Sequence, residues 1–255
     1  MISRLRPVRA CRNILARRAL SSLTDADVDA FQRDGAVPIR GLLTAPQLEA
    51  LRAGAEWNMA NPGPLAVTAS TPDDPGRFFE DFCNWQRLPA MERFIRNSPA
   101  AQIAAELSHS DQIRLYHDHV LVKEPGTRQC TPWHQDQPYY NVDGRQNASM
   151  WFPVDPVPVE SSLRIVAGTH LGPWYMPRTF LDEQAKWFPE GSLAEPPDFD
   201  ADIAADPAAW TVLAWELEPG DAVFFNMLSV HGAGGVSGDR RRRVLSVRFL
   251  GDDMV

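Results

Sequence analysis

The chain of 255 residues has few cysteines, no long apolar run and no excess of positive charge. Cys11, Cys83 and Cys130 are scattered without paired spacing, which indicates neither a disulfide framework nor a thiolate zinc site and favours a reducing compartment. No stretch of about 18 apolar residues occurs, so no membrane span is predicted. The net charge of -8 argues against nucleic-acid backbone binding as the main task.

Prolines and glycines, by contrast, are frequent. The 22 prolines and 16 glycines favour a fold with many turns over a helical bundle. A hydrophobic share of 44% and a charged share of 23% are typical of a globular protein. The length suits one large domain, which we expect to span residues 23–255.

Residues 1–22 differ from the rest of the chain. They contain six arginines and no acid. This composition is typical of a mitochondrial presequence. The alternative is a disordered Arg-rich extension of a cytoplasmic protein, and the lack of an evident cleavage signal favours it.

Hydrophobic periodicity predicts helices early in the chain and many short strands after residue 113. The expected helices span residues 24–34, 45–59, 91–96 and 100–108, and the expected strands span 36–43, 113–123, 131–136, 149–154, 163–166, 211–213, 221–225 and 244–250. Many short strands with turns between them indicate a sandwich or small barrel. A Pro- and acid-rich insertion at about 171–209 is long enough to predict a lid.

A histidine and an aspartate two residues apart mark the first candidate site. His134 and Asp136 lie in the motif WHQD at 133–136, on an expected strand. Because strand side chains alternate, both project from one face, which suits a divalent first-row metal. A third candidate ligand is His231, which follows a buried strand and precedes the glycine-rich residues 232–235. Two imidazoles and one carboxylate form the facial triad of non-haem Fe(II) oxygenases.

A basic residue downstream of His231 makes this site more specific. Arg242 lies eleven residues after His231, at the start of an expected strand. The guanidinium fork binds a carboxylate through two hydrogen bonds, as a dicarboxylate cosubstrate requires. For the four arginines at 240–243 the alternative is a solvated basic turn, which we expect to hold for two or three of them.

With these motifs in order, the chain resembles the phytanoyl-CoA dioxygenase-like family of Fe(II)/2-oxoglutarate-dependent oxygenases from about residue 23 to residue 253. The resemblance is carried by FQRDG at 31–35, KEPG at 123–126, WHQD at 133–136, GTH at 168–170, EPGD at 218–221, HGA at 231–233 and Arg242. It implies an all-β core with flanking helices, folded as a double-stranded β-helix of the jelly-roll or cupin-like barrel type.

The resemblance also implies cofactors and residue roles. The cofactors are Fe(II), 2-oxoglutarate and O2. His134, Asp136 and His231 look like the iron ligands, and Arg242 looks like the partner of the distal carboxylate of 2-oxoglutarate. The positions that line the cosubstrate in relatives are Leu121, Thr131, Tyr140 and Ala233.

Two positions depart from the family pattern. Ala233 stands where relatives often have a serine, which removes one hydrogen bond to the cosubstrate, and Ser161-Ser162 replaces the usual Asn-Gly. Asp136 retains a metal carboxylate, which argues against the halogenating relatives.

Five further residues are candidate substrate contacts, each with a structural alternative: Lys123, His119, Tyr139, Trp151 and Arg248. His119 and its strand neighbour His117 fit cavity lining or the core better than iron ligation. Lys123 is as consistent with a surface lysine, and the two aromatics with core packing. An inward Arg248 would need an acidic partner such as Asp221 or a substrate carboxylate.

The predicted function is Fe(II)- and 2-oxoglutarate-dependent hydroxylation of a C–H bond in a small organic substrate, with release of succinate and CO2. A second hypothesis is a non-catalytic jelly-roll that binds a ligand or scaffolds an assembly. The triad together with Arg242 favours the enzyme. Nucleic-acid binding through residues 240–243 conflicts with the acidic composition.

Overall fold

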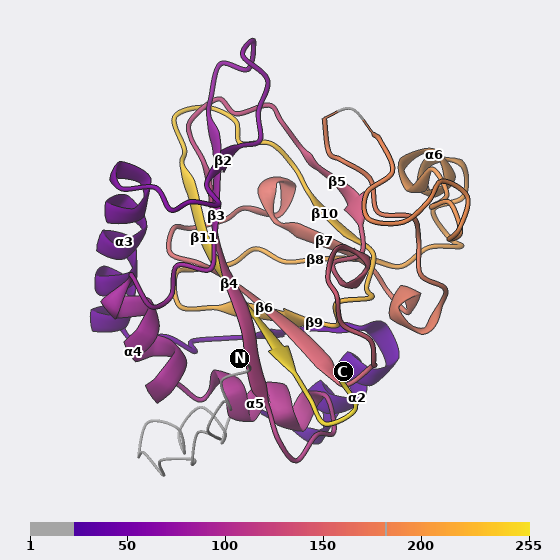
Figure 1. Ribbon diagram of the computed structural model, residues 1–255, viewed down its shortest axis with the longest axis horizontal. Helices are drawn as coiled ribbons and strands as arrows, with labels where there is room; N and C mark the ends of the chain where they lie inside the picture. The colour runs from indigo at the N-terminus through magenta and orange to yellow at the C-terminus, as the bar shows by residue number, and fades with distance from the viewer. Residues whose placement is uncertain (1–22, 182) are drawn as a thin grey trace.

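The computed structural model describes residues 23–181 and 183–255, which form two antiparallel β-sheets flanked by helices (Figure 1). The Arg-rich segment at 1–22, predicted to be disordered or a targeting signal, lies outside the described residues. Within the described ranges, no helix is long and apolar enough to cross a membrane.

The strands divide into a sheet of seven, ordered β1-β9-β6-β11-β4-β3-β2, and a sheet of four, ordered β5-β10-β7-β8. The larger sheet contains β1 (Ala36–Ile39), β2 (Val67–Thr68), β3 (Phe78–Phe82), β4 (Arg114–Lys123), β6 (Asn147–Pro153), β9 (Ala222–Phe225) and β11 (Arg242–Leu250). The smaller sheet contains β5 (Thr131–His134), β7 (Leu163–Val166), β8 (Val212–Ala214) and β10 (His231–Ala233). The predicted jelly-roll class is confirmed, although the described residues form two sheets and no closed barrel.

The helices begin and end where the local sequence dictates. The α-helices of the described ranges are α2 (Asp25–Asp34), α3 (Ala45–Ala60), α4 (Pro89–Asn97), α5 (Ala100–Leu107) and α6 (Phe199–Ala205), and the 3-10 turns are η1 (Gln137–Tyr139), η2 (Val159–Ser161) and η3 (Thr169–Leu171). Thr24 and Asp27 form a reciprocal capping box at the start of α2. That helix ends at Gly35, whose φ of 83° suits a residue without a Cβ atom.

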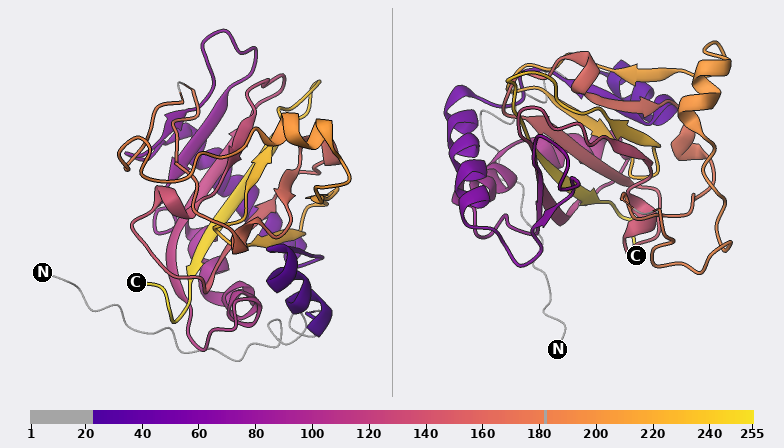
Figure 2. Two further views of the ribbon diagram at one scale, coloured as in Figure 1. Left: turned by 90° about the vertical axis from the view of Figure 1, so that its right-hand side faces the viewer. Right: turned by 90° about the horizontal axis from the view of Figure 1, so that it is seen from above.

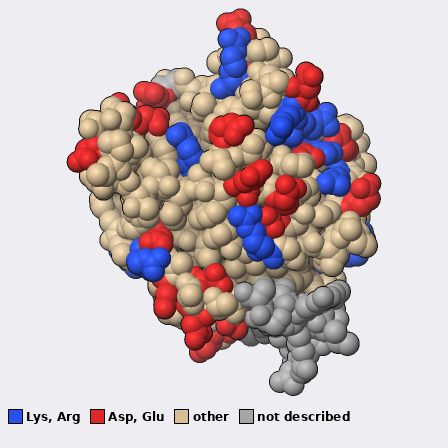
Figure 3. Space-filling model, turned by 180° about the vertical axis from the view of Figure 1, so that it is seen from behind, with Lys and Arg blue, Asp and Glu red and all other residues tan. Residues whose placement is uncertain are grey.

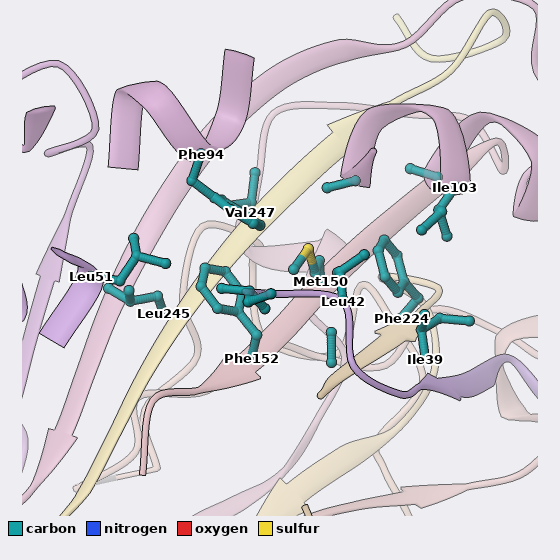
Figure 4. Packing of buried hydrophobic residues seen from close by; sticks show 14 of the residues in the cluster. Ile39, Leu42, Leu51, Phe94, Ile103, Met150, Phe152, Phe224, Leu245 and Val247 are labelled. Atoms are coloured by element: carbon teal, nitrogen blue, oxygen red, sulfur yellow. The ribbon is translucent and has the colours of Figure 1, made fainter. Parts of the chain in front are cut away.

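The main core lies between the helices and the outer face of the larger sheet. Figure 4 shows Leu51, Phe94 and Ile103 from the helices packed against side chains of the sheet such as Phe152. Strand alternation sends the preceding residue, Trp151, to the opposite face, where a second apolar cluster fills part of the space between the two sheets. A cavity lined by residues of both sheets also opens on this inner side.

Several short elements were not predicted from the sequence. These are β2, β3, β10 and α6. β3 is buried along most of its length on both faces, and β10 has three residues, so neither presents a period-2 pattern. The strand expected over 131–136 ends at His134, because the chain enters the turn η1 after Asp136.

The insertion at 171–209 lies beside the smaller sheet, on the side away from α3 and α4 (Figures 1 and 2). It is mostly irregular, and α6 is its one helix in the part of the insertion that the structure describes.

The arginines at 240–243 do not form a free basic surface. Arg241 pairs with Glu56 and Glu124, Arg243 pairs with Asp155 and Glu56, and Arg242 is buried. The face seen from behind in Figure 3 likewise carries basic and acidic side chains side by side.

Gly35 gives a test of the packing between α2 and the loop after β9. A Cβ atom there would overlap Ser229 Oγ, lie 2.5 Å from His170 Nδ1 and require a positive φ. We expect Gly35→Ala to lower the free energy of unfolding by about 2–4 kcal/mol, measured by denaturant unfolding. Gly41→Ala is the matched control, since φ is also positive but no atom of the described residues lies within 4 Å of the added Cβ, and it should cost about 1 kcal/mol. Equal losses would show that backbone strain alone, without the clash, accounts for the effect.

Candidate active site

Strand pairing brings the two candidate histidine ligands together. His134 ends β5 and His231 begins β10, and the two residues are direct partners in the register of the smaller sheet. Asp136 follows β5 by two residues. Its Oδ1 atom lies 3.6 Å from His134 Nε2 and 3.7 Å from His231 Nε2. The three ligand atoms all lie within 4.8 Å of one another, close enough to share one metal ion.

Backbone carbonyls fix the orientation of both imidazoles. The Nδ1 atom of His134 lies 2.8 Å from Pro132 O, and that of His231 lies 2.9 Å from Ser229 O. These contacts favour the tautomer with a proton on Nδ1, which leaves Nε2 as the ligand atom. Burial and the adjacent His134 lower the pKa of His231 to about 3, so this ring is neutral near pH 7.

The carboxylate of Asp136 is held from its other side. Its Oδ2 atom accepts hydrogen bonds from Ser149 Oγ and Arg248 Nη2, each at 3.1 Å, and leaves Oδ1 toward the histidines. Burial alone would raise the pKa of Asp136, but Arg248 and the two imidazoles hold it well below its usual range. The site therefore presents an ionised carboxylate and two oriented imidazoles, the donor set that Fe(II) accepts in a facial triad.

The partner of Arg248 differs from the acids considered from the sequence. Arg248 pairs with Asp136, whereas Asp221 pairs with Arg40 at 2.6 Å and accepts from Gly41 N. Arg248 lines the cavity, and its Nη2 atom holds Asp136, so it positions this candidate ligand. A contact of Arg248 with a substrate stays a prediction.

A cavity of about 630 Å³ opens beside the three ligands. All five predicted cosubstrate positions line it, namely Leu121, Thr131, Tyr140, Ala233 and Arg242. Of the five predicted substrate contacts, four line it: His119, Tyr139, Trp151 and Arg248. The predicted site residues thus converge, from both sheets, on a single space.

Lys123 is the exception. It does not belong to the cavity lining. Its ammonium is fully buried and donates to Gln129 O at 2.6 Å and Gly234 O at 3.0 Å. Burial, and then the charge of Arg242, lower its pKa to about 7. The hypothesis of a substrate contact or surface lysine is therefore wrong, since Lys123 ties β4 to the loop after β10.

Arg242 is a buried guanidinium without a carboxylate partner in the described part of the chain. Its Nη1 atom donates to Ser161 O and lies 3.5 Å from Gly234 O, while Nε has no hydrogen-bond partner there. The guanidinium carbon lies 5.8 Å from the centre of the Trp151 ring. Burial lowers the pKa of Arg242 to about 10, so it stays charged at neutral pH. A buried unpaired cation is costly, and a ligand carboxylate would complete it.

Comparison with known proteins identifies the family. The family model for phytanoyl-CoA dioxygenase (PhyH) matches residues 31–244. The chain belongs to this family. Membership confirms the predicted enzyme class, a 2-oxoglutarate-dependent non-haem iron oxygenase, and with it the predicted cofactors Fe(II), 2-oxoglutarate and O2. No curated protein sequence matches the chain.

Solved structures share the fold of this phytanoyl-CoA dioxygenase family member. The non-heme alpha ketoglutarate dependent carbocyclase SnoK from nogalamycin biosynthesis is 23% identical, with a TM-score of 0.73 over 92% of this chain and 87% of that chain. The epimerase SnoN in complex with Fe3+, alpha ketoglutarate and nogalamycin RO is 22% identical, with a TM-score of 0.72 over 90% and 84%. EctD from S. alaskensis, in its apoform, is 17% identical, with a TM-score of 0.69 over 97% and 82%.

The insertion supplies cavity residues that sequence reasoning did not name individually. Residues 178–181 together with Lys186 and Trp187 line the cavity, and the Phe180 ring lies 4.8 Å from the His134 ring. Tyr139 fastens the segment, because its hydroxyl donates to Arg178 O at 2.6 Å and accepts from Arg178 N at 3.0 Å.

Sequence reasoning also missed three residues at the site: Ser149, Glu80 and Phe82. Ser149 gave no signal, because one buried serine in a strand is unremarkable. β3 contains three phenylalanines in five residues, and this high strand propensity could have predicted the strand. His117 lies outside the cavity lining, edge-on to Tyr140 at 4.9 Å, as expected of a core histidine.

The contact between Arg248 and Asp136 can be tested through metal affinity. Among the described residues, Arg248→Met leaves Ser149 as the one remaining partner of Asp136 Oδ2. We therefore expect Zn(II) affinity to fall by about 10- to 100-fold, measured by titration calorimetry. Arg40→Met, which removes the ion pair with Asp221, is the matched control and should leave metal affinity unchanged. An equal response of the two variants would contradict the positioning role.

Proposed function

We propose that this protein hydroxylates a C–H bond of a small organic substrate, with 2-oxoglutarate converted to succinate and CO2. Of the two oxygen atoms of O2, one enters the substrate and the other enters succinate. The observation that carries the proposal is the triad of His134, Asp136 and His231 in one cavity with the unpaired buried Arg242. A ligand-binding jelly-roll has no need of both.

In this proposal the residues of the chain bind Fe(II) and 2-oxoglutarate, and these bound groups supply the oxidation chemistry. His134, Asp136 and His231 would hold Fe(II), and Arg242 would hold the distal carboxylate of 2-oxoglutarate. Bound together, iron and 2-oxoglutarate supply the oxidising power with O2. The chain orients these groups through the carbonyl contacts of the imidazoles and the contact of Arg248 with Asp136.

We further propose that residues 23–255 act as one oxygenase domain and that 171–209 is its lid. The lid side of the cavity is formed by Phe180 and Trp187, and the opposite walls are largely apolar and aromatic. Such walls would keep water from the reacting groups while leaving room for an organic substrate.

The iron site is tested by anaerobic addition of Fe(II) and 2-oxoglutarate. We expect a metal-to-ligand charge-transfer absorption in the visible range, which His134→Ala abolishes because one of three protein ligands is lost. His109→Ala, at an exposed histidine, is the control and should keep the absorption. Absence of the absorption in the wild type, with no succinate formed in air, would favour a non-catalytic jelly-roll.

The proposed binding of 2-oxoglutarate by Arg242 is tested by comparison with its neighbour Arg241. Arg242→Lys loses the two-pronged geometry, so we expect 2-oxoglutarate affinity to fall by about 10- to 100-fold, measured by titrating the charge-transfer absorption. Arg241→Lys is the matched control, since Arg241 forms ion pairs with Glu56 and Glu124 outside the cavity lining. A loss confined to Arg241→Lys, or no loss in either variant, would contradict the assignment.

A further inference from the structure

The second strand from the edge of the larger sheet places a carboxylate in the cavity. Side chains of β3 alternate, so Phe79 packs in the core under the helices and Asp81 bonds to Asn58, while Glu80 and Phe82 face inward. Glu80 is 7% exposed and lines the same cavity as the three metal ligands.

An imidazole on the neighbouring strand meets this carboxylate. His119 on β4 is the register partner of Phe82, whose ring stacks on the imidazole at 3.9 Å between centroids. His119 Nε2 lies 3.3 Å from Glu80 Oε1, but neither ring nitrogen has a hydrogen-bond partner in the described part of the chain. Phe82 covers the ring face, so the ring nitrogens are left to bond in the plane of the ring. Burial lowers the pKa of His119, which favours the neutral ring.

Other buried carboxylates in this protein have several hydrogen-bond donors. Asp81 accepts from Asn58 Nδ2 and Gly63 N, and Asp118 accepts from the backbone N–H groups of residues 84 and 85. For Glu80, by contrast, the described chain provides the approach of His119 Nε2 at 3.3 Å, which lacks hydrogen-bond geometry. Buried polar groups are rarely left in this state, because the unmade hydrogen bonds cost free energy. The pair is therefore suited to a donor that comes from outside the protein.

We propose that Glu80 and His119 form a substrate subsite that binds a hydrogen-bond donor, either a hydroxyl or a protonated amine. Glu80 and Asp136 are the two acids among the described lining residues, and Asp136 is engaged by Arg248 and Ser149. Glu80 and His119 present a carboxylate oxygen and a ring nitrogen to the cavity, and no hydrogen bond from the described part of the chain engages the ring nitrogens. A substrate with such a donor fits this wall, whereas a plain hydrocarbon or a carboxylate placed there does not.

This inference rests on the proposed function, since it assumes that the substrate occupies this cavity. The test uses the full chain loaded with 2-oxoglutarate and Zn(II), which is redox-inert and prevents turnover. Three probes of similar size are compared by ligand-observed NMR titration: cyclohexylmethanol, cyclohexylmethylamine and methoxycyclohexane. The ether is an isomer of the alcohol without a donor. We expect one or both donor probes to bind about tenfold more tightly than the ether.

Variants of Glu80 show whether the preference for the donor probes over the ether comes from this side chain. They also show whether it depends on hydrogen bonding or on charge. Glu80→Leu removes the acceptor, so the donor and ether probes should bind equally. Glu80→Gln keeps an acceptor without charge, so a preference for the alcohol should survive it and a preference for the amine should not. Glu92→Leu, which removes a half-exposed carboxylate paired with Arg96 on α4, is the matched control and should keep the wild-type preference.

The outcomes are distinguishable from one another. Equal binding of all three probes to the wild type, or a preference that persists in Glu80→Leu, overturns the subsite. The melting temperature of Glu80→Leu shows whether this variant folds. If it does not, the wild-type comparison and Glu80→Gln still decide whether the subsite exists. Failure of Zn(II) and 2-oxoglutarate to bind at all would instead count against the proposed function.

Discussion

A buried ion pair between Asp136 and Arg248 connects the two sheets at the site. Asp136 follows β5 of the smaller sheet, and Arg248 lies on β11, in the middle of the larger one. An ionised carboxylate could not remain in this apolar interior without a cationic or hydrogen-bonding partner. With Oδ2 held by Arg248 and Ser149, Oδ1 is left to face the two histidines. The geometry of the triad therefore depends on how the sheets face each other.

The largely apolar cavity also contains polar groups whose hydrogen bonding the described chain leaves incomplete. Arg242 has no carboxylate partner among the described residues, and Glu80 and His119 approach each other without a hydrogen bond. Each incomplete group lowers stability in the free protein and strengthens binding when a ligand completes it. Arg242 and the Glu80–His119 pair thus supply opposite chemistry, a donor for a carboxylate and acceptors for a hydroxyl or amine.

Residues in contiguous motifs were predictable because their function depends on short-range spacing. His134 and Asp136 lie two residues apart, and the glycines after His231 and the arginine after them are local features. The partner of Arg248 was not predictable in this way, because 112 residues separate it from Asp136. The sequence analysis named Asp221 or a substrate carboxylate as the partner, whereas Asp221 pairs with Arg40 in the structure. The burial of Lys123 was not predicted for a similar reason, since one of the two carbonyls that bind it, Gly234 O, lies 111 residues away in the sequence.

The sequence alone predicted a sandwich or small barrel, three candidate metal ligands and a candidate arginine for the cosubstrate, since alternating strands, turn residues and ordered motifs are local properties. Only the tertiary structure decided which charges meet. Pairing of β10 with β5 set His231 opposite His134, and the contact of the sheets brought Arg248 to Asp136. The short strand β3, invisible to periodicity, carried Glu80 to His119. Long-range pairing is set by the packing of both sheets together, and no local pattern encodes it.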